Sequence, residues 1–497
     1  MDYFTLLLGS IFASILLIFV SKRSNKKLPP GPIQLPIIGN LFHLSGAKPH
    51  ISLANLSNYY GPIISLKLGH ITTVVISSSA MAKQVLQKQD QKFSNRFIPN
   101  AIQAHNHYKF SVTWLPVGPT WRSLRRILNS NILSLTKLDA NQQLRSQKVQ
   151  QLVDYVAKCS QEGEAVVIGK AAFKTSLNLL SNILFSKDLV DPFSDSNVEL
   201  KNVIWNIVAE VGKPNLVDFF PILEKIDPQR IRRNTYIYFT KLFVLFDDLI
   251  NERLEEKRTS ENIEKNDVLE MFLKIQEENS EEIDQNHIKS LLLDIFTGGT
   301  DTTTSTVEWA MAEILKQPEI MKKAQAELAK IVGMGKLIEE ADVYRLPYLQ
   351  CIVKETLRMH PPVPFLLPRK VEEDVEVCGY IVPKGSQVLI NVWAIGRDPA
   401  SWEDPLVFKP ERFLNLEVDV RGKDFELIPF GAGRRICPGL PLAAFRMVPI
   451  MLGSLLNSFN WKLEEGTSST PKELDMEEKF GITLAKARPL RAIPSPI

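Results

Sequence analysis

A long apolar stretch, from about Gln285 to Lys316, constrains the fold more than any other feature of this sequence. Apolar residues dominate both of its halves, and Gln317-Pro318 supplies a helix stop directly after it. A helix that is apolar over most of its surface is expected to run through the centre of a protein rather than along its outside. We therefore predict one mainly α-helical body with minor β structure, built around this segment.

The middle of this stretch, Thr297 to Thr306, reads TGGTDTTTST. Two glycines and many β-branched residues form a poor helix sequence, and hydroxyl groups that bond back to helix carbonyls can bend a helix. A buried helix with an acid, several hydroxyls and missing side chains at mid-length has room there for something small and polar. The alternative is that the helix ends here and a new one, capped by these hydroxyls, begins near Thr300.

A single cysteine, Cys437, lies in the glycine-rich run FGAGRRICPG at 430–439, ahead of an apolar and apparently helical stretch from Leu440 to Leu456. Backbone N–H groups at a helix start, and the charges of Arg434 and Arg435, can stabilise a thiolate. The glycines allow the backbone to approach a flat ligand closely. A lone cysteine is usually an inert buried residue, but this context indicates a ligand.

Two further pairs have helical spacing. Glu355 and Arg358 lie three residues apart on a predicted helix from 348 to 360, and Trp121 and Arg125 lie four apart. Glu355 and Arg358 read most simply as a surface ion pair, which stabilises little. Trp121 and Arg125 could offer an indole N–H and a guanidinium to an anionic group.

The N-terminus predicts a membrane anchor. No charged residue occurs from Tyr3 to Val20, which is just long enough to cross a bilayer as a helix, and basic residues follow it. A cleaved signal peptide would have its basic residues first and a shorter apolar region. We predict an anchor over 1–21, a basic and Pro-rich hinge over 22–36 and a catalytic domain over 37–497. The positive-inside rule places that domain on the cytoplasmic side.

Composition adds exclusions. The net charge of +3 gives no reason to expect nucleic acid as a partner. Four cysteines in 497 residues, none at a metal-ligand spacing, predict neither a disulfide framework nor a zinc site.

Two β runs, 63–68 and 72–77, flank Gly69-His70 and predict a hairpin.

Together these motifs resemble the cytochrome P450 family of the plant microsomal type, over essentially the whole chain. The cysteine loop is similar to the family's F-x-x-G-x-R-x-C-x-G pattern, and Gly298 to Thr303 resembles its oxygen-activation motif. Glu355 to Arg358 matches E-x-x-R, and Pro410 to Phe413 matches the segment that joins it. The resemblance implies a single haem-thiolate body behind a transmembrane helix.

The resemblance also implies roles. Cys437 would be the axial ligand of haem b, its thiolate favouring O–O cleavage. Asp301 and Thr302 would deliver protons during oxygen activation. Glu355, Arg358 and Arg412 would form a structural triad. The haem propionates would be held by Trp121, Arg125, Arg369 and Arg435. Partners would be O2, an NADPH–cytochrome P450 reductase and a small apolar substrate, at the endoplasmic reticulum membrane.

Within the family, the chain is most similar to plant hydroxylases of monoterpene alcohols, so we expect hydroxylation of geraniol or nerol at C8. Diterpenes, coumarins, flavonoids and xenobiotics are alternative substrates. A haem-thiolate isomerase or dehydratase, which needs no reductase, is a further alternative, but such enzymes tend to lack the Asp301-Thr302 pair. Asn106 or His107 could contact a substrate hydroxyl. By analogy with the family, the expected pocket residues are Ile102, Phe110, Val112, Leu293, Phe296, Val363, Phe365, Leu366 and Ile482.

Overall fold

The structure is a computed structural model that describes residues 27–44, 46, 48–194, 198–259, 265–278, 283–464 and 473–497. The predicted anchor over 1–21 and the first part of the predicted hinge lie outside these residues.

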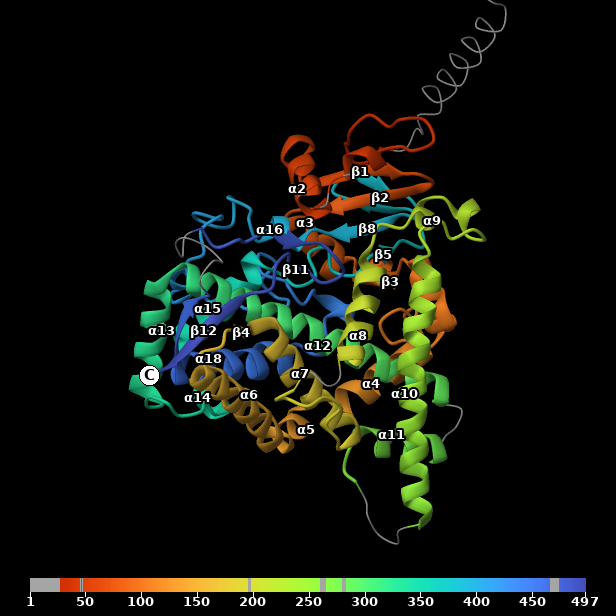
Figure 1. Ribbon diagram of the computed structural model, residues 1–497. Coiled ribbons are helices and arrows are strands. Elements are labelled where there is room, and N and C mark those ends of the chain that lie inside the picture. Colours follow the sequence, from red (N-terminus) through yellow and green to blue (C-terminus); the bar gives the residue numbers. More distant parts are fainter. Residues whose placement is uncertain are drawn as a thin grey trace, which may run out of the picture.

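The described body is mainly helical with small sheets, as the sequence predicted (Figure 1). The five-stranded sheet lies at the top of the view, and most of the helices lie below it. The longer helices are α2 (Pro49–Tyr60), α4 (Pro119–Asn131), α6 (Gln142–Glu162), α7 (Ile168–Phe185), α8 (Val198–Gly212), α10 (Ile231–Thr259), α11 (Val268–Glu278), α12 (Gln285–Lys316), α13 (Pro318–Ile331), α15 (Pro347–Met359) and α18 (Val448–Ser458).

The central helix α12 is continuous. Asp284 and His287 form a capping box at its start, and α13 begins at Pro318 directly after its end. In the middle of α12, threonine hydroxyls donate to the carbonyl four residues earlier, at 2.7 to 2.9 Å. The alternative of a new helix near Thr300 is therefore wrong: the hydroxyls bond within the helix that they were expected to cap.

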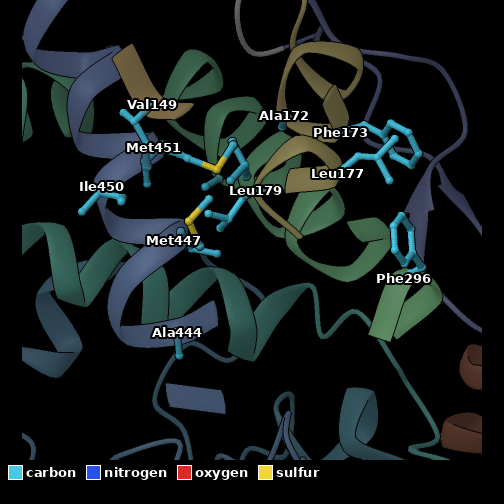
Figure 2. Packing of buried hydrophobic residues seen from close by; sticks show 14 of the residues in the cluster. Val149, Ala172, Phe173, Leu177, Leu179, Phe296, Ala444, Met447, Ile450 and Met451 are labelled. Carbon is cyan, nitrogen blue, oxygen red and sulfur yellow. The ribbon is translucent and has the colours of Figure 1, made fainter. Parts of the chain in front are cut away.

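Two glycines let α7 and α12 approach closely. A Cβ at Gly169 of α7 would lie 2.7 Å from the carboxylate of Glu308, and a Cβ at Gly299 of α12 would lie 2.7 Å from Leu180. Buried side chains of α6, α7, α12 and α18 fill the surrounding core, with Met447 and Met451 beside Leu179 in Figure 2. This packing fixes α12 in the interior.

The largest sheet carries the predicted hairpin, which is confirmed. β1 (Ile63–Leu68) pairs antiparallel with β2 (Ile71–Ile76), and β8 (Gln387–Ile390) runs parallel to β2. β5 (Arg369–Lys370) joins β8 to β3 (Asn95–Arg96), which gives the strand order β1-β2-β8-β5-β3. Because Arg96 and Arg369 are register partners, this sheet edge places two guanidinium groups side by side.

The remaining described sheets are smaller. Their strands are β4 (Val166–Val167), β12 (Arg491–Pro496) and β9 (Phe459–Leu463) in one sheet, β10 (Glu478–Lys479) and β11 (Ala485–Lys486) in a second, and β6 (Val375–Val377) and β7 (Tyr380–Val382) in a third. The tip of the β10–β11 hairpin, Gly481 to Leu484, lies beside α12, since the carbonyl of Leu484 accepts hydrogen bonds from Ser305 and Trp309.

One helical stretch of the described residues, Leu440–Ser458, is long and apolar enough to span a membrane by length and composition. It includes α17 (Leu440–Leu442) and α18, and 78% of it is buried inside the body. It is therefore a core helix, as expected for the apolar stretch that follows the cysteine loop.

Candidate active site

The cysteine loop is fixed against its neighbours by backbone contacts. The N–H of Cys437 donates to the carbonyl of Phe430 at 2.9 Å, which closes the loop. Gly433 has a φ of +69°, and a Cβ there would lie 2.2 Å from the carbonyl oxygen of Leu86. Only glycine fits this close approach in a left-handed conformation. Arg434 pairs with Asp90 at 2.9 Å and ties the loop to the segment that carries Leu86.

The sulfur of Cys437 faces a cavity of about 360 Å³. Burial raises the pKa of its thiol, while the N–H groups of Gly439 and Leu440 and the charge of Arg125 oppose that rise. These donors match the expectation that the start of the following helix stabilises a thiolate. Of the four cysteines, all unpaired and all within the described residues, Cys437 alone lines the cavity.

Four guanidinium groups line the same cavity: Arg96, Arg125, Arg369 and Arg435. They bond to backbone carbonyls, for example Arg125 to Ile436 at 2.6 Å and Arg369 to Phe93 at 2.9 Å. Among the described residues no carboxylate forms an ion pair with any of the four. Arg96 was not predicted from the sequence. Its position in the cluster follows from the pairing of β3 with β5, in which Arg96 and Arg369 are register partners.

This charge is only partly compensated among the described residues. Burial lowers the pKa of Arg369 to about 10, and burial with the charges of Arg369 and Arg125 lowers the pKa of Arg435 to about 9, while the charge of Asp90 opposes both shifts. Burial and the other three arginines hold the pKa of Arg96 well below its usual range. The Nε of Arg369 is buried without a hydrogen-bond partner. Buried cations without counter-ions are costly, so the cluster fits an anionic ligand, and the two propionates of a haem supply that charge.

Trp121 also lines the cavity. Its indole N–H donates to the carbonyl of Val112 at 3.0 Å. The guanidinium carbon of Arg435 lies 4.7 Å from the centre of its ring. Trp121 therefore contacts Arg435 through a cation–π interaction, and its bond to a propionate stays a prediction.

Both glycines of α12 line the cavity, but they differ in what a side chain would meet. A Cβ at Gly299 would lie 2.7 Å from Leu180 of α7, whereas a Cβ at Gly298 would meet nothing within 4 Å. Thr302 lines the cavity one turn later, and its hydroxyl donates to the carbonyl of Gly298 at 2.7 Å. This part of α12 therefore leaves open space in the cavity that Cys437 also lines, as a flat cofactor requires.

Asp301 lies beside Thr302 but is not part of the cavity lining. It is buried, and its carboxylate is hydrogen-bonded to Thr483 of the β10–β11 hairpin and to Trp205 of α8. Burial raises the pKa of Asp301, so the side chain is suited to holding a proton. Its partner Thr483 lines the cavity, which connects Asp301 to the cavity wall.

The structure separates the nine expected pocket residues into two groups. Those that line the cavity are Ile102, Val112, Leu293, Val363, Leu366 and Ile482. The other three do not line it, because their rings pack elsewhere. Phe110 lies edge-on to His287, Phe365 contacts Phe480, and Phe296 packs between Phe185 and Phe246 at 5.9 and 5.6 Å. Figure 2 shows Phe296 turned toward Phe173 and Leu177 of α7.

The two polar candidates also differ. Asn106 lies in the loop η4 (Asn100–Lys109), has a φ of +56° and does not line the cavity. His107 is buried, lines the cavity and contacts Asp294 of α12. The sequence offered no reason to single out Asp294 beyond its being an acid in an apolar run.

Glu355, Arg358 and Arg412 form one buried ion cluster. Arg358 donates twice to the carboxylate of Glu355, at 2.7 and 2.8 Å, and Arg412 donates once, at 3.0 Å. Glu355 and Arg358 are both fully buried, so the surface ion pair that their spacing also allowed is wrong. Arg358 also donates to the carbonyls of Gly396 and Pro405, and the cluster thereby joins α15 to an irregular segment.

A cysteine, an open glycine position on α12 and guanidinium groups without an ion-pair partner among the described residues line one cavity, and together they define a haem-thiolate site. The chain belongs to the cytochrome P450 family, whose model matches residues 29–489. It is a P450 monooxygenase, an oxidoreductase whose haem iron is bound by a cysteine thiolate, and it requires O2 and a redox partner.

Its curated relatives are similar over their whole length. The chain is 65% identical to a geraniol 8-hydroxylase of Catharanthus roseus, covering all of both chains. It is 62% identical to a geraniol 8-hydroxylase of Swertia mussotii, covering all of this chain and 99% of the relative. A drimenol monooxygenase of Persicaria hydropiper is 51% identical over all of this chain and 98% of the relative.

Proposed function

We propose that this protein hydroxylates a monoterpene alcohol, geraniol or nerol, at C8. The observation that carries the proposal is the cavity at Cys437, whose walls are mainly apolar apart from the arginines, which suit the haem propionates, and a smaller set of other polar side chains. A small apolar alcohol suits such a lining. Identities of 62 to 65% with two geraniol 8-hydroxylases support this substrate, and the drimenol monooxygenase makes a larger terpene alcohol the second candidate.

When bound, the haem supplies the activation of O2: one oxygen atom enters a C–H bond, and the other leaves as water with two electrons and two protons. The protein's part is to hold the cofactor, orient the substrate and move protons. Arg96, Arg125, Arg369 and Arg435 would hold the propionates through charge-assisted bonds.

Proton delivery would use the acid and the alcohol of α12. Asp301, with its raised pKa, would hold a proton inside the protein, and the Thr302 hydroxyl would pass protons into the cavity. The bond from Thr302 to the Gly298 carbonyl would orient that hydroxyl. Thr483 would connect Asp301 to the cavity wall.

The electron donor would be an NADPH–cytochrome P450 reductase at the endoplasmic reticulum membrane. The predicted anchor over 1–21 and hinge over 22–36 would hold the domain over 37–497 on the cytoplasmic side. Large apolar side chains exposed near the start of the described chain, among them Ile33 at 89% and Phe42 at 71%, support contact with a bilayer. Ile222 is 87% exposed on a neighbouring segment. A hydrogen bond from the backbone N–H of His70 to the carbonyl of Phe219 joins that segment to the β1–β2 turn.

The test is a substrate panel. Membranes containing the protein, a plant reductase and NADPH should convert geraniol and nerol to their 8-hydroxy products, identified by mass spectrometry. Turnover of a diterpene, a coumarin or drimenol with none of geraniol or nerol would contradict the proposal. Product formation without NADPH consumption would instead indicate an isomerase or dehydratase.

A further inference from the structure

The wall of the largely apolar cavity carries a carboxylate and an imidazole. Asp294 of α12 and His107 of η4 both line it, with a separation of 3.2 Å between Nε2 of His107 and Oδ1 of Asp294. Their side chains are only 9% and 3% exposed, respectively. A buried carboxylate in an apolar wall is costly unless hydrogen bonds satisfy it, so its partners indicate what it is for.

Asp294 has three hydrogen-bond donors among the described residues. The Ser111 hydroxyl lies 2.7 and 2.9 Å from its two oxygens, the ring of His107 contacts Oδ1, and the N–H of Thr113 lies 3.3 Å from Oδ2. A carboxylate has about four acceptor positions, so about one remains. Its only ion-pair partner among the described residues is His107, whose second nitrogen is 3.3 Å from Ser290. Asp294 can therefore accept one further hydrogen bond from a group in the cavity.

The spacing along α12 sets how far this carboxylate lies from Thr302, and that distance can be compared with the length of the substrate. Thr302 follows Asp294 by eight residues, which corresponds to ~12 Å along the axis of a helix that rises 1.5 Å per residue. Both residues line the cavity, and Cys437 lines it as well. Eight bonds separate the hydroxyl oxygen of geraniol from C8. An extended chain advances ~3.3–3.6 Å for every three bonds, so eight bonds span ~9–10 Å.

We propose that Asp294, oriented by Ser111 and His107, accepts a hydrogen bond from the substrate's primary hydroxyl and thereby presents the opposite end of the chain to the oxidising end of the cavity. This inference rests on the proposed function. The wall residues Ile102, Leu293, Val363 and Ile482 would enclose the hydrocarbon between the two ends. Asp294 is then a specificity-determining residue: oxidation occurs at the methyl group farthest from the hydroxyl because the hydroxyl is fixed at the other end.

The first experiment uses the wild-type holoenzyme with geraniol, its methyl ether and the corresponding hydrocarbon without oxygen. Dissociation constants come from the substrate-induced change in the haem absorbance spectrum. Geraniol should bind about 10- to 100-fold more tightly than either analogue, the range for one hydrogen bond to a charged group. Equal affinities for geraniol and its methyl ether, which cannot donate, would overturn the inference.

The second experiment compares Asp294→Ala with Asp248→Asn, which removes an exposed carboxylate from α10. Asp294→Ala should weaken geraniol binding about 10- to 100-fold, leave hydrocarbon binding unchanged and spread oxidation from C8 to other allylic positions. Asp248→Asn should change none of these. The carbon monoxide spectrum of each reduced variant reports whether the fold and the thiolate ligand are intact.

The outcomes separate the two proposals. If geraniol and nerol give no product at all, the proposed function fails. If geraniol is hydroxylated at C8 with the same affinity and the same product in the Asp294→Ala variant, only the role of Asp294 fails.

Discussion

Two buried arginine clusters in this protein differ in what neutralises them. Arg358 and Arg412 share the carboxylate of Glu355, which is itself fully buried, so each guanidinium group of that cluster has an ion-pair partner within the protein. The cluster that lines the cavity has no carboxylate partner among the described residues, and burial lowers the pKa of its guanidinium groups.

The difference distinguishes a structural site from a binding site. Both clusters donate to backbone carbonyls, so hydrogen bonding alone does not separate them. The absence of a paired carboxylate does separate them, because an anion that enters the cavity would lower the free-energy cost of the buried guanidinium groups. The propionates of the family's haem have that charge, and removing residues from the two clusters should consequently have opposite effects.

The largest effect is expected when the paired cluster is broken. Glu355→Gln would leave two buried guanidinium groups without their counter-ion, which costs about 3–5 kcal/mol. The variant should unfold at a much lower temperature and yield little protein with a carbon monoxide spectrum. Thermal unfolding close to that of the wild type would contradict a structural role for the cluster.

A partly buried carboxyl group that has no ion-pair partner among the described residues sharpens the comparison. Asp218 of α9 (Leu216–Phe219) accepts the N–H of Asn100 at 2.6 Å, and burial raises its pKa to about 6. Because the folded pKa lies above the unfolded value, the stabilisation is complete below pH ~4 and is lost as the pH rises through about 6. A shift of about two pKa units corresponds to about 3 kcal/mol.

Thermal unfolding of the wild type between pH 4 and pH 7 should therefore show a decline in stability that Asp218→Asn removes. Parallel curves for the two proteins would show that the carboxyl of Asp218 does not titrate in this range.

The cavity cluster should respond in the opposite way to the paired one. Arg369→Met removes a buried charge that has no ion-pair partner among the described residues, so the apoprotein should be at least as stable as the wild type. Its haem should be released about 10- to 100-fold faster, since one hydrogen bond to a charged group stabilises by about 1.5–3 kcal/mol. Transfer of haem to apomyoglobin measures that rate.

Arg122→Met, which removes an exposed guanidinium of α4 that does not line the cavity, is the control and should change haem release little. An Arg369→Met apoprotein that is clearly destabilised would place this residue with the structural cluster.

A smaller effect separates the two glycines of α12. Gly299→Ala places a methyl group against the end of the Leu180 side chain, which must shift to make room, so we expect this variant to be about 1 kcal/mol less stable than Gly298→Ala. Gly298→Ala meets open space and removes a glycine from a helix interior, so it should stabilise the apoprotein by about 0.5–1 kcal/mol. Urea unfolding ranks the two variants, and the reverse order would contradict these contacts.

Patterns along the chain predicted the elements that depend on local sequence. The apolar stretch around Thr297–Thr306 gave the central helix, and the alternation around Gly69-His70 gave the hairpin. The helical spacing of Glu355 and Arg358 placed them on one helix, but their burial depends on residues 396–409, which contact them only in the folded chain.

The cavity wall was predicted less well because orientation around a helix is set by packing. Leu293 and Phe296 lie on the same helix, yet only Leu293 faces the cavity, while Phe296 fills the aromatic contact with α7 and α10. Arg96 and Asp294 were missed for a related reason. The role of each residue depends on a partner far away in the chain. Arg96 lies beside Arg369, and Asp294 accepts a hydrogen bond from Ser111.

Oxygen labelling tests the central claim most directly. The holoenzyme with a reductase, NADPH and geraniol should be supplied with ¹⁸O2, and the product analysed by mass spectrometry. One ¹⁸O atom should appear at C8 of the product, and Cys437→Ala should abolish both the thiolate-type carbon monoxide spectrum and the product. A product without ¹⁸O, or turnover that persists in Cys437→Ala, would contradict the assignment of this protein as a haem-thiolate geraniol hydroxylase.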